Sequence, residues 1–222
     1  MENLLSEKES LDLIGQMIST AKNNLQKGIG KIFLLWGYLV AIISLLTFIL
    51  LITLPPETKY YAYYLWFLIF AAYPVHFILV KNKEKEKMVT TYIEKVMNWV
   101  WIAFSISILV VVAGLLLAMV LVMPAFTDVR PGHEFDRWFQ WLFITPLMLC
   151  LYGFALFVSG KAYAFKPLST GGVICWIATF IILISIHHIH VLAIQQIVLT
   201  ISAVAGFVIP GHLLNYKENH HV

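Results

Sequence analysis

The residues best suited to chemistry in this chain are histidines beside long apolar segments. His187, His188 and His190 lie in the run HHIH, and His133 and Asp136 lie in the loop TDVRPGHEFDRW. Imidazole and carboxylate groups are ligands for zinc, copper and nickel. The spacing matches no standard metal site, and the H-E-x-x-H pattern of zinc peptidases is absent. The five residues are therefore candidate metal ligands, and the alternative is that they are ordinary polar loop residues.

Two further histidines follow prolines near the ends of two apolar segments. Residues 73–81 read YPVHFILVK and residues 209–217 read IPGHLLNYK, so both repeat the order proline, histidine, lysine at the same spacing. Proline removes a backbone donor and kinks a helix, and the lysine can extend to the lipid phosphates. We expect anchored helix ends in which His76 and His212 each bond a backbone carbonyl. The alternative is that the two imidazoles meet across the bundle in a proton-sensitive or metal-binding contact.

Four uncharged polar side chains lie in or beside the apolar segments. Gln195 and Gln196 are adjacent inside the last segment, and Gln140 and Thr145 lie near the start of the fourth. Such groups commonly bridge neighbouring helices by hydrogen bonds. The alternative is that they line a polar cavity used for transport.

Two lysines mark a turn between apolar segments as a candidate lipid contact. Lys161 and Lys166 lie in GKAYAFKPLSTGG. The free N–H groups at the start of the following helix attract anions, so this turn is a candidate site for a lipid headgroup phosphate. The alternative is that the lysines only mark the cytoplasmic side. The sequence predicts no catalytic residue and no bound cofactor, and it contains no ATP-binding loop.

Ionisable residues avoid the interior of the apolar segments. No Asp, Glu, Lys or Arg lies deep within any of them. Charged side chains at that depth mark proton relays, ion pathways and many membrane active sites. Their absence argues against a proton-driven pump and against a membrane hydrolase with carboxylates at mid-depth.

The composition is typical of a polytopic membrane protein. The chain is 60% hydrophobic and 12% charged, and its mean hydropathy is +0.84. Because crossing the hydrocarbon layer takes about 20 apolar residues, we predict an all-α bundle of six transmembrane helices. The predicted spans are residues 32–54, 60–80, 96–122, 138–158, 168–186 and 191–214. The last two form one tract broken only by HHIH, so we expect the chain to turn there.

The basic residues predict the orientation of the bundle. Of the 15 lysines and arginines, all but Lys59, Arg130 and Arg137 lie in the segments that share a side with the termini. Such an excess marks the cytoplasmic side, so both termini are expected inside a bacterial cytoplasmic membrane. The formal net charge of +3 is therefore a topology signal and does not indicate nucleic-acid binding.

Two amphipathic segments are expected on the cytoplasmic surface. Residues 1–31 precede the first span and residues 81–96 precede the third, and apolar residues recur at helical spacing in both. Either segment is a candidate contact for the lipid bilayer or for a protein partner. Residues 32–214 then form the membrane domain and residues 215–222 a cytoplasmic tail.

Small residues are expected where helices approach each other, because apolar burial does not drive helix association inside lipid. The candidate packing faces are Gly37 and Ala41 on the first span, Ala103, Ser107, Gly114 and Ala118 on the third, and Ser202 and Gly206 on the sixth.

The function is open among three hypotheses. The missing intramembrane charge and the amphipathic segments favour a non-enzymatic scaffold, sensor or accessory subunit. The first alternative is a small permease built from three helical hairpins, since each even span contains a proline: Pro74, Pro146 or Pro210. Parallel repeats of this sort occur in some transporters. The second alternative is a metal-binding protein or enzyme that uses the outer histidines.

Two stretches carry a resemblance to known sequences. IFLLWGYLV in the first span and GHLLNYK near the end resemble stretches of small six-span bacterial integral membrane proteins that are uncharacterised. The resemblance implies a multi-pass protein of the bacterial cytoplasmic membrane, and it implies no particular activity.

Overall fold

The computed structural model describes residues 10–13, 15, 28–85, 91–121 and 142–220. Every regular element in these ranges is helical. Six segments are long and apolar enough to cross a membrane: Ile29–Thr53, Lys59–Asn82, Tyr92–Leu117, Ile144–Ala162, Lys166–Ile184 and Val191–Glu218. The predicted all-α, six-span fold is therefore confirmed.

Four spans are single α-helices: α2 (Ile29–Thr53), α4 (Tyr92–Leu121), α6 (Ile144–Ala162) and α7 (Lys166–Ile184). The other two spans join segments of different helix type. The second is the 3₁₀-helix η1 (Lys59–Ala71) followed by α3 (Ala72–Lys85). The sixth is α8 (Val191–Ala203), the π-helix η4 (Val204–Val208) and α9 (Ile209–Asn219).

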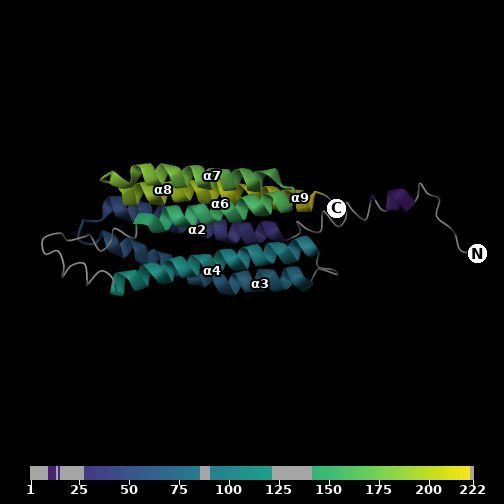
Figure 1. The fold of residues 1–222 in the computed structure, drawn as a ribbon, viewed down its shortest axis with the longest axis horizontal. Helices are drawn as coiled ribbons and strands as arrows, with labels where there is room; N and C mark the ends of the chain where they lie inside the picture. The colour runs from purple at the N-terminus through teal and green to yellow at the C-terminus, as the bar shows by residue number, and fades with distance from the viewer. Residues whose placement is uncertain (1–9, 14, 16–27, 86–90, 122–141, 221–222) are drawn as a thin grey trace, which may run out of the picture.

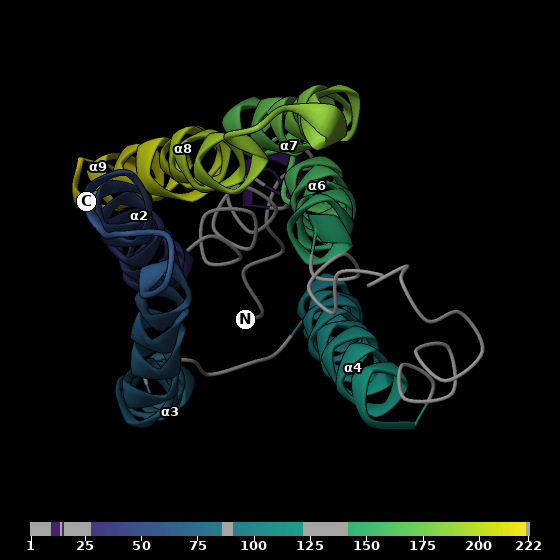
Figure 2. The ribbon, with the colours of Figure 1, turned by 90° about the vertical axis from the view of Figure 1, so that its left-hand side faces the viewer.

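The spans run along one common axis (Figure 1). Seen along that axis, they form an open arc with α3 at one end and α4 at the other (Figure 2). α2 packs against α3, η1, α8 and α9; α7 packs against α6, α8 and η4; and α4 packs against α6. We call α2 and α6 to α9 the compact part, and η1, α3 and α4 the open part.

Burial differs sharply between the two parts. In the most apolar stretch of each span, 50% of the residues are buried in the sixth span and 44% in the fourth. The corresponding shares are 6% in the second span and 0% in the third. The rest of the chain therefore leaves most side chains in the apolar stretches of the second and third spans uncovered.

Glycines set the close contacts of the compact part. A Cβ atom added at Gly37 of α2 would lie 2.7 Å from Cβ of Phe207, and one added at Gly171 of α7 would lie 2.7 Å from Cα of Gly206. A Cβ atom at Gly172 would lie 2.6 Å from the carbonyl oxygen of Gly153 on α6. These backbones can touch only because the side chains are missing. The predicted packing faces of the first and sixth spans are thus confirmed at Gly37 and Gly206.

The packing face expected on the third span is wrong. A Cβ atom added at Gly114 would meet nothing within 4 Å, and Ala103 is exposed. The physical reason is the place of α4 at the end of the arc, where its neighbour α6 covers one side of it. Small residues permit close packing, but they do not supply the neighbour.

The prolines of the second and sixth spans both follow a segment that is not α-helical. Pro74 follows η1, and Pro210 follows η4, in which the N–H of Ile209 bonds the carbonyl of Val204. A proline lacks the N–H that would continue the α-helical ladder behind it, and a π-helical turn is one way to absorb the defect. Pro146 lies in the first turn of α6, where no such bond is lost.

The chain turns at the HHIH run, as expected. α7 ends at Ile184, and Ser185–His187 form a short 3₁₀-helix, η3. His188 is extended, with φ −75° and ψ 138°, and its Nδ1 accepts a hydrogen bond from the backbone N–H of His190 at 3.1 Å. The imidazole thereby provides the turn-closing acceptor that Asn or Asp side chains often supply.

The amphipathic segments fall only partly within the described residues. Most of residues 1–31 and residues 86–90 lie outside them. Residues 92–96, assigned above to the second amphipathic segment, begin α4 itself. Thr91 and Glu94 start that helix with a reciprocal capping box, in which each backbone N–H donates to the other side chain at 3.3 Å.

Candidate functional site

A polar seam crosses the interface between the first and last spans. Ser44 and Thr47 on α2 are fully buried, and each is 2.7 Å from the carbonyl four residues earlier in its own helix. Ser44 Oγ also lies 2.8 Å from Thr200 Oγ1 on α8. Buried hydroxyls must have such partners in lipid, because no water is there to replace them. The seam therefore fixes the register of α2 against the antiparallel α8.

Two adjacent glutamines extend this seam to other elements. Gln195 and Gln196 are only 1% and 2% exposed. Gln195 Nε2 donates to the carbonyl of Leu142, just before α6, at 2.7 Å. The Gln196 side chain lies beside Tyr63 of η1, and its Oε1 has no partner within the described ranges. The two amides thus connect α8 with α6 on one side and with the second span on the other.

The glutamines and Thr145 lie between helices. Thr145 is 6% exposed, and Gln140 lies outside the described residues. For the two glutamines, the structure agrees with a bridging role. Their burial does not show the polar cavity that the transport hypothesis expected them to line.

His76 and His212 have partners that neither sequence expectation named. Trp36 Nε1 of α2 donates to His76 Nδ1 at 3.1 Å, and Tyr38 Oη of α2 lies 2.6 Å from His212 Nε2. The expected carbonyl partners and the expected contact between the imidazoles are both wrong. Trp36 and Tyr38 are two residues apart, so they leave α2 on nearly opposite sides. The two Pro-x-His endings therefore hold α3 and α9 to opposite sides of α2.

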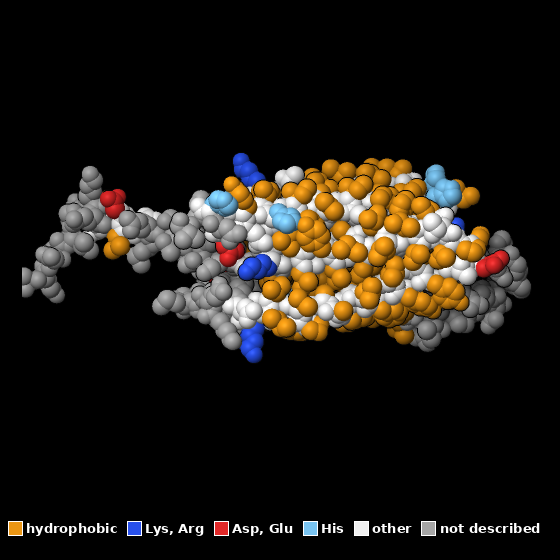
Figure 3. All heavy atoms as spheres, turned by 180° about the vertical axis from the view of Figure 1, so that it is seen from behind, with side chains coloured by type: hydrophobic (Ala, Val, Ile, Leu, Met, Phe, Trp, Pro, Cys, Tyr) orange, Lys and Arg blue, Asp and Glu red, His pale blue; other side chains and the backbone are white. Residues whose placement is uncertain are grey.

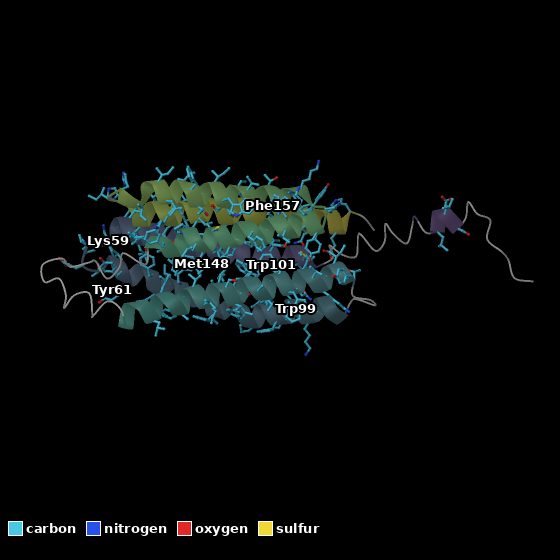
Figure 4. All side chains as sticks on the ribbon, in the orientation of Figure 1. Lys59, Tyr61, Trp99, Trp101, Met148 and Phe157 are labelled. Atoms are coloured by element: carbon cyan, nitrogen blue, oxygen red, sulfur yellow. The ribbon has the colours of Figure 1, made fainter. Side chains whose placement is uncertain are left out.

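A closed ring of aromatic side chains, the aromatic ring, joins four elements. Consecutive ring centroids lie 5.0 to 5.9 Å apart along Phe33, Trp101, Phe104, Tyr152 and Phe207, and Phe207 returns to Phe33. These side chains come from α2, α4, α6 and η4. Each pair contributes roughly 0.5–1.5 kcal/mol beyond its area burial. Trp101 thereby connects α4 to the compact part, well away from Lys59 and Tyr61 at the other end of the molecule (Figure 4).

A second set of aromatic side chains lies on the lipid-exposed face of the second span. Tyr61, Tyr64, Phe67, Phe70 and Tyr73 recur every third residue, with consecutive ring centroids 5.8 to 6.4 Å apart. We call this set the aromatic ladder. All five side chains are at least 45% exposed. The expectations from the sequence did not include this ladder, although the period of three is visible in the residue order.

The outer-face metal candidates are only partly placed. The rings of His188 and His190 lie 5.8 Å apart, and His188 Nδ1 already accepts the turn bond. His133 and Asp136 lie outside the described residues, as does the side chain of His187. Among the residues that the structure does describe, no three His, Cys, Asp or Glu side chains gather around one point. The five-residue metal site stays a prediction.

The turn between α6 and α7 holds Lys161 and Lys166 at the membrane surface. Phe165 N–H donates to the carbonyl of Gly160 at 2.8 Å, and Ala164 adopts a left-handed φ of 50°. Burial raises the pKa of Tyr163 in this turn to about 12. Both lysines are exposed, and the Lys161 ammonium lies 5.3 Å from the Phe157 ring centroid.

Each of the six spans carries a lysine at the same end. They are Lys31, Lys81, Lys95, Lys161, Lys166 and Lys217. Figure 3 shows lysine side chains gathered at that end of the hydrophobic band. Two acidic groups nearby are already engaged with backbone: Glu94 in the capping box, and Glu218, whose Oε2 accepts from Gly28 N–H at 3.1 Å. Among the side chains that the structure describes, this end therefore has more lysines than carboxylates.

Comparison with known protein families gives one match. Residues 61–189, from η1 to the turn before α8, match the ABC 3 transport family. This stretch is more than half of the 222-residue chain. No curated protein and no solved structure matches the chain significantly.

Proposed function

Because the chain belongs to the ABC 3 transport family, we propose that it is the membrane-spanning permease component of an ATP-driven transporter. The family match carries this proposal, and the six spans are consistent with it. The sequence alone favours a scaffold, sensor or accessory subunit of no known activity. The family match supports the permease alternative better.

We propose that the source of energy for such a permease is a separate subunit. Ionisable residues are absent from the depth of the spans, so the chain offers no side chains for coupling to protons. The sequence also contains no ATP-binding loop. A permease of this composition needs a separate ATPase subunit, and transporters of this kind also use a solute-binding protein. These two subunits are the partners that we propose.

The basic end of the bundle is the face that we propose for the cytoplasm. ATP is hydrolysed in the cytoplasm, so the ATPase subunit has to meet this face. Lysines near a membrane surface are attracted to anionic lipids by about 1 kcal/mol each. We propose that Lys161 and Lys166, on the tight α6–α7 turn, contact lipid headgroups beside the ATPase docking surface.

The test is the ATP dependence of a complex isolated from its own membranes. The full-length chain, tagged at the C-terminus, is cross-linked in native membranes, purified and incubated with a photoreactive ATP analogue. The proposal predicts that a co-purifying subunit is labelled and that the complex hydrolyses ATP. A chain that purifies without any nucleotide-binding subunit, and membrane vesicles whose solute uptake is unaffected by its deletion, would contradict it.

A further inference from the structure

The second span is a helix of unusual type for its length. η1 runs for 13 residues as a 3₁₀-helix, whereas such runs seldom exceed three or four residues. It becomes α-helical only at Ala72, two residues before Pro74. Long stretches of 3₁₀-helix within a helical span often mark a functional hinge.

The aromatic ladder explains why this sequence adopts a 3₁₀-helix. In a 3₁₀-helix, residues three apart eclipse each other, so side chains of period three form one straight stripe. From Tyr61 to Tyr73 the rings follow that stripe, and the interplanar angles fall from 37° to 24°. An α-helix turns about 20° less per residue, so it would spread the same rings over roughly 240° of the helix surface. The ladder contacts are therefore specific to the 3₁₀ form.

Two contacts connect this span to the compact part, one near each end. At the outer end, Ala62 and Tyr63 pack in one cluster with Leu192 and Ala193 of α8, and the Gln196 side chain lies beside Tyr63. His76 accepts from Trp36 of α2 at the inner end, where Trp36 also contacts Tyr73 edge-on. Ala62 and Ala72 are buried beside these contacts. Between them, Phe67, Leu68 and Phe70 are each more than half exposed. Trp66 lies between the two ends and packs against the core of the compact part. A change of helix type in η1 therefore has to release this contact and the outer one, while His76 holds the inner end.

From these contacts we infer that the second span is the moving element of the permease, which interconverts between a 3₁₀ form and an α form. The role of the span in transport rests on the proposed function, whereas the change of helix type does not. Thirteen residues span about 26 Å as a 3₁₀-helix and about 20 Å as an α-helix. Conversion shortens the span by about 6 Å. It also rotates one end of the span against the other, which pulls Tyr63 away from Gln196 and opens the polar seam at its outer end.

The experiment measures the length of η1 in the full chain. Spin labels are attached through non-natural amino acids at positions 57 and 75, which flank η1 and leave Cys150 and Cys175 in place. Double electron–electron resonance in lipid nanodiscs then gives the distance distribution. The wild-type chain should show a main distance and a minor one shorter by about 6 Å.

Matched variants separate the ladder from general effects. Phe67→Ala removes two ladder contacts and should raise the ratio of the short to the long component by about tenfold. Leu68→Ala removes a similar volume from an exposed neighbour outside the ladder, and it should behave like the wild type. Gln196→Leu releases the outer end and should also raise the short component. One unchanged distance in the wild type, Phe67→Ala and Gln196→Leu overturns the inference.

Uptake measurements distinguish this inference from the proposed function. If Phe67→Ala shifts the distances and lowers uptake while Leu68→Ala does neither, the moving-element role is supported. If the distances shift and uptake by the same variant stays at the wild-type rate, that role is overturned although the permease assignment stands. If the wild-type chain supports no uptake at all, the proposed function fails, and the distance result alone decides whether the helix has two forms.

Discussion

The third and sixth spans show how differently two apolar helices can be used in one molecule. The third span has the higher hydropathy, 2.7 against 2.1, yet none of its most apolar stretch is buried and half of that of the sixth is. Apolar character therefore places a segment in the membrane, but it does not decide which segments pack. The sixth span packs because Gly206 and Gly211 let other backbones approach, whereas Gly114 of the third span has no neighbour.

The same comparison separates a fixed part from the part that contains the span we infer to move. The compact part is held by backbone contacts at glycines and by the buried polar seam. The open part is attached by the aromatic ring, by the contact of α4 with α6, and by the packing of η1 and α3 on α2. The proposed permease would use both parts, since a moving span has to work against a fixed reference.

The largest difference between the parts is expected from adding a side chain to a glycine. Gly171→Leu places a side chain against Gly206 Cα, and overpacking of this kind costs about 3 kcal/mol or more. Gly114→Leu, in open surroundings on α4, should cost less than about 0.5 kcal/mol. Unfolding of both variants in mixed micelles with increasing SDS measures the difference. Equal destabilisation by the two substitutions would remove the distinction between the parts.

A somewhat smaller effect is expected from the aromatic ring. Phe207→Ala removes contacts with Phe33 and Tyr152 and leaves a cavity, which costs about 3–4 kcal/mol in buried sites and less here because lipid can fill part of the space. The matched control is Phe180→Ala on α7, whose side chain is 66% exposed. The same SDS titration should show a clear loss for Phe207→Ala and almost none for Phe180→Ala. A loss of similar size in both variants would mean that the ring does not link the parts.

The third effect is a pH dependence of the stability of the folded chain, which arises at the α6–α7 turn in the compact part. The folded pKa of Tyr163 is about 12, above the ordinary value of about 10. Between pH 10 and pH 12 the folded chain retains a phenol proton that the unfolded chain loses. The contribution of Tyr163 to stability is therefore complete below pH 10 and decreases as the pH rises towards 12. Thermal unfolding of the wild type and Tyr163→Phe at pH 9 and pH 11 should show a larger loss in the wild type. Identical losses would show that the phenol is not shielded from water.

The smallest effect is expected at the lysines, because exposed charges are screened by salt. Replacing Lys161 and Lys166 by Gln should reduce the number of anionic lipids retained in native mass spectrometry, whereas Lys59→Gln at the opposite end should not. Nanodiscs with and without phosphatidylglycerol supply the comparison. Unchanged retention in the double variant would leave the two lysines as topology signals alone.

Much of the fold follows from local patterns in the sequence. The six spans follow from the lengths of the apolar runs, and the turn at HHIH follows because a single helix of that length would exceed the bilayer. Gly37 and Gly206 were identifiable as packing positions from residue size. Those features depend on residues that are close together in the sequence, so one sequence is enough to predict them.

The other features depend on residues that are distant in sequence. Trp36 and Tyr38 became partners of His76 and His212 only through the packing of α2 between α3 and α9. The aromatic ring likewise needs four elements to be placed. The failure at Gly114 has the same origin, since the number of neighbours of a helix is set by its place in the arc. The 3₁₀ form of η1 is different, because the period of three from Tyr61 to Tyr73 was available in the sequence.

The most direct test of a fixed part and a movable part is single-molecule fluorescence energy transfer on two labelled pairs. One pair, at Ile42 of α2 and Phe180 of α7, lies within the compact part, and the other, at Ile42 and Leu68 of η1, joins the two parts; all three positions are exposed. In nanodiscs, the account predicts a single narrow transfer efficiency for the first pair and two or more interconverting efficiencies for the second. A single narrow efficiency for both pairs would contradict it.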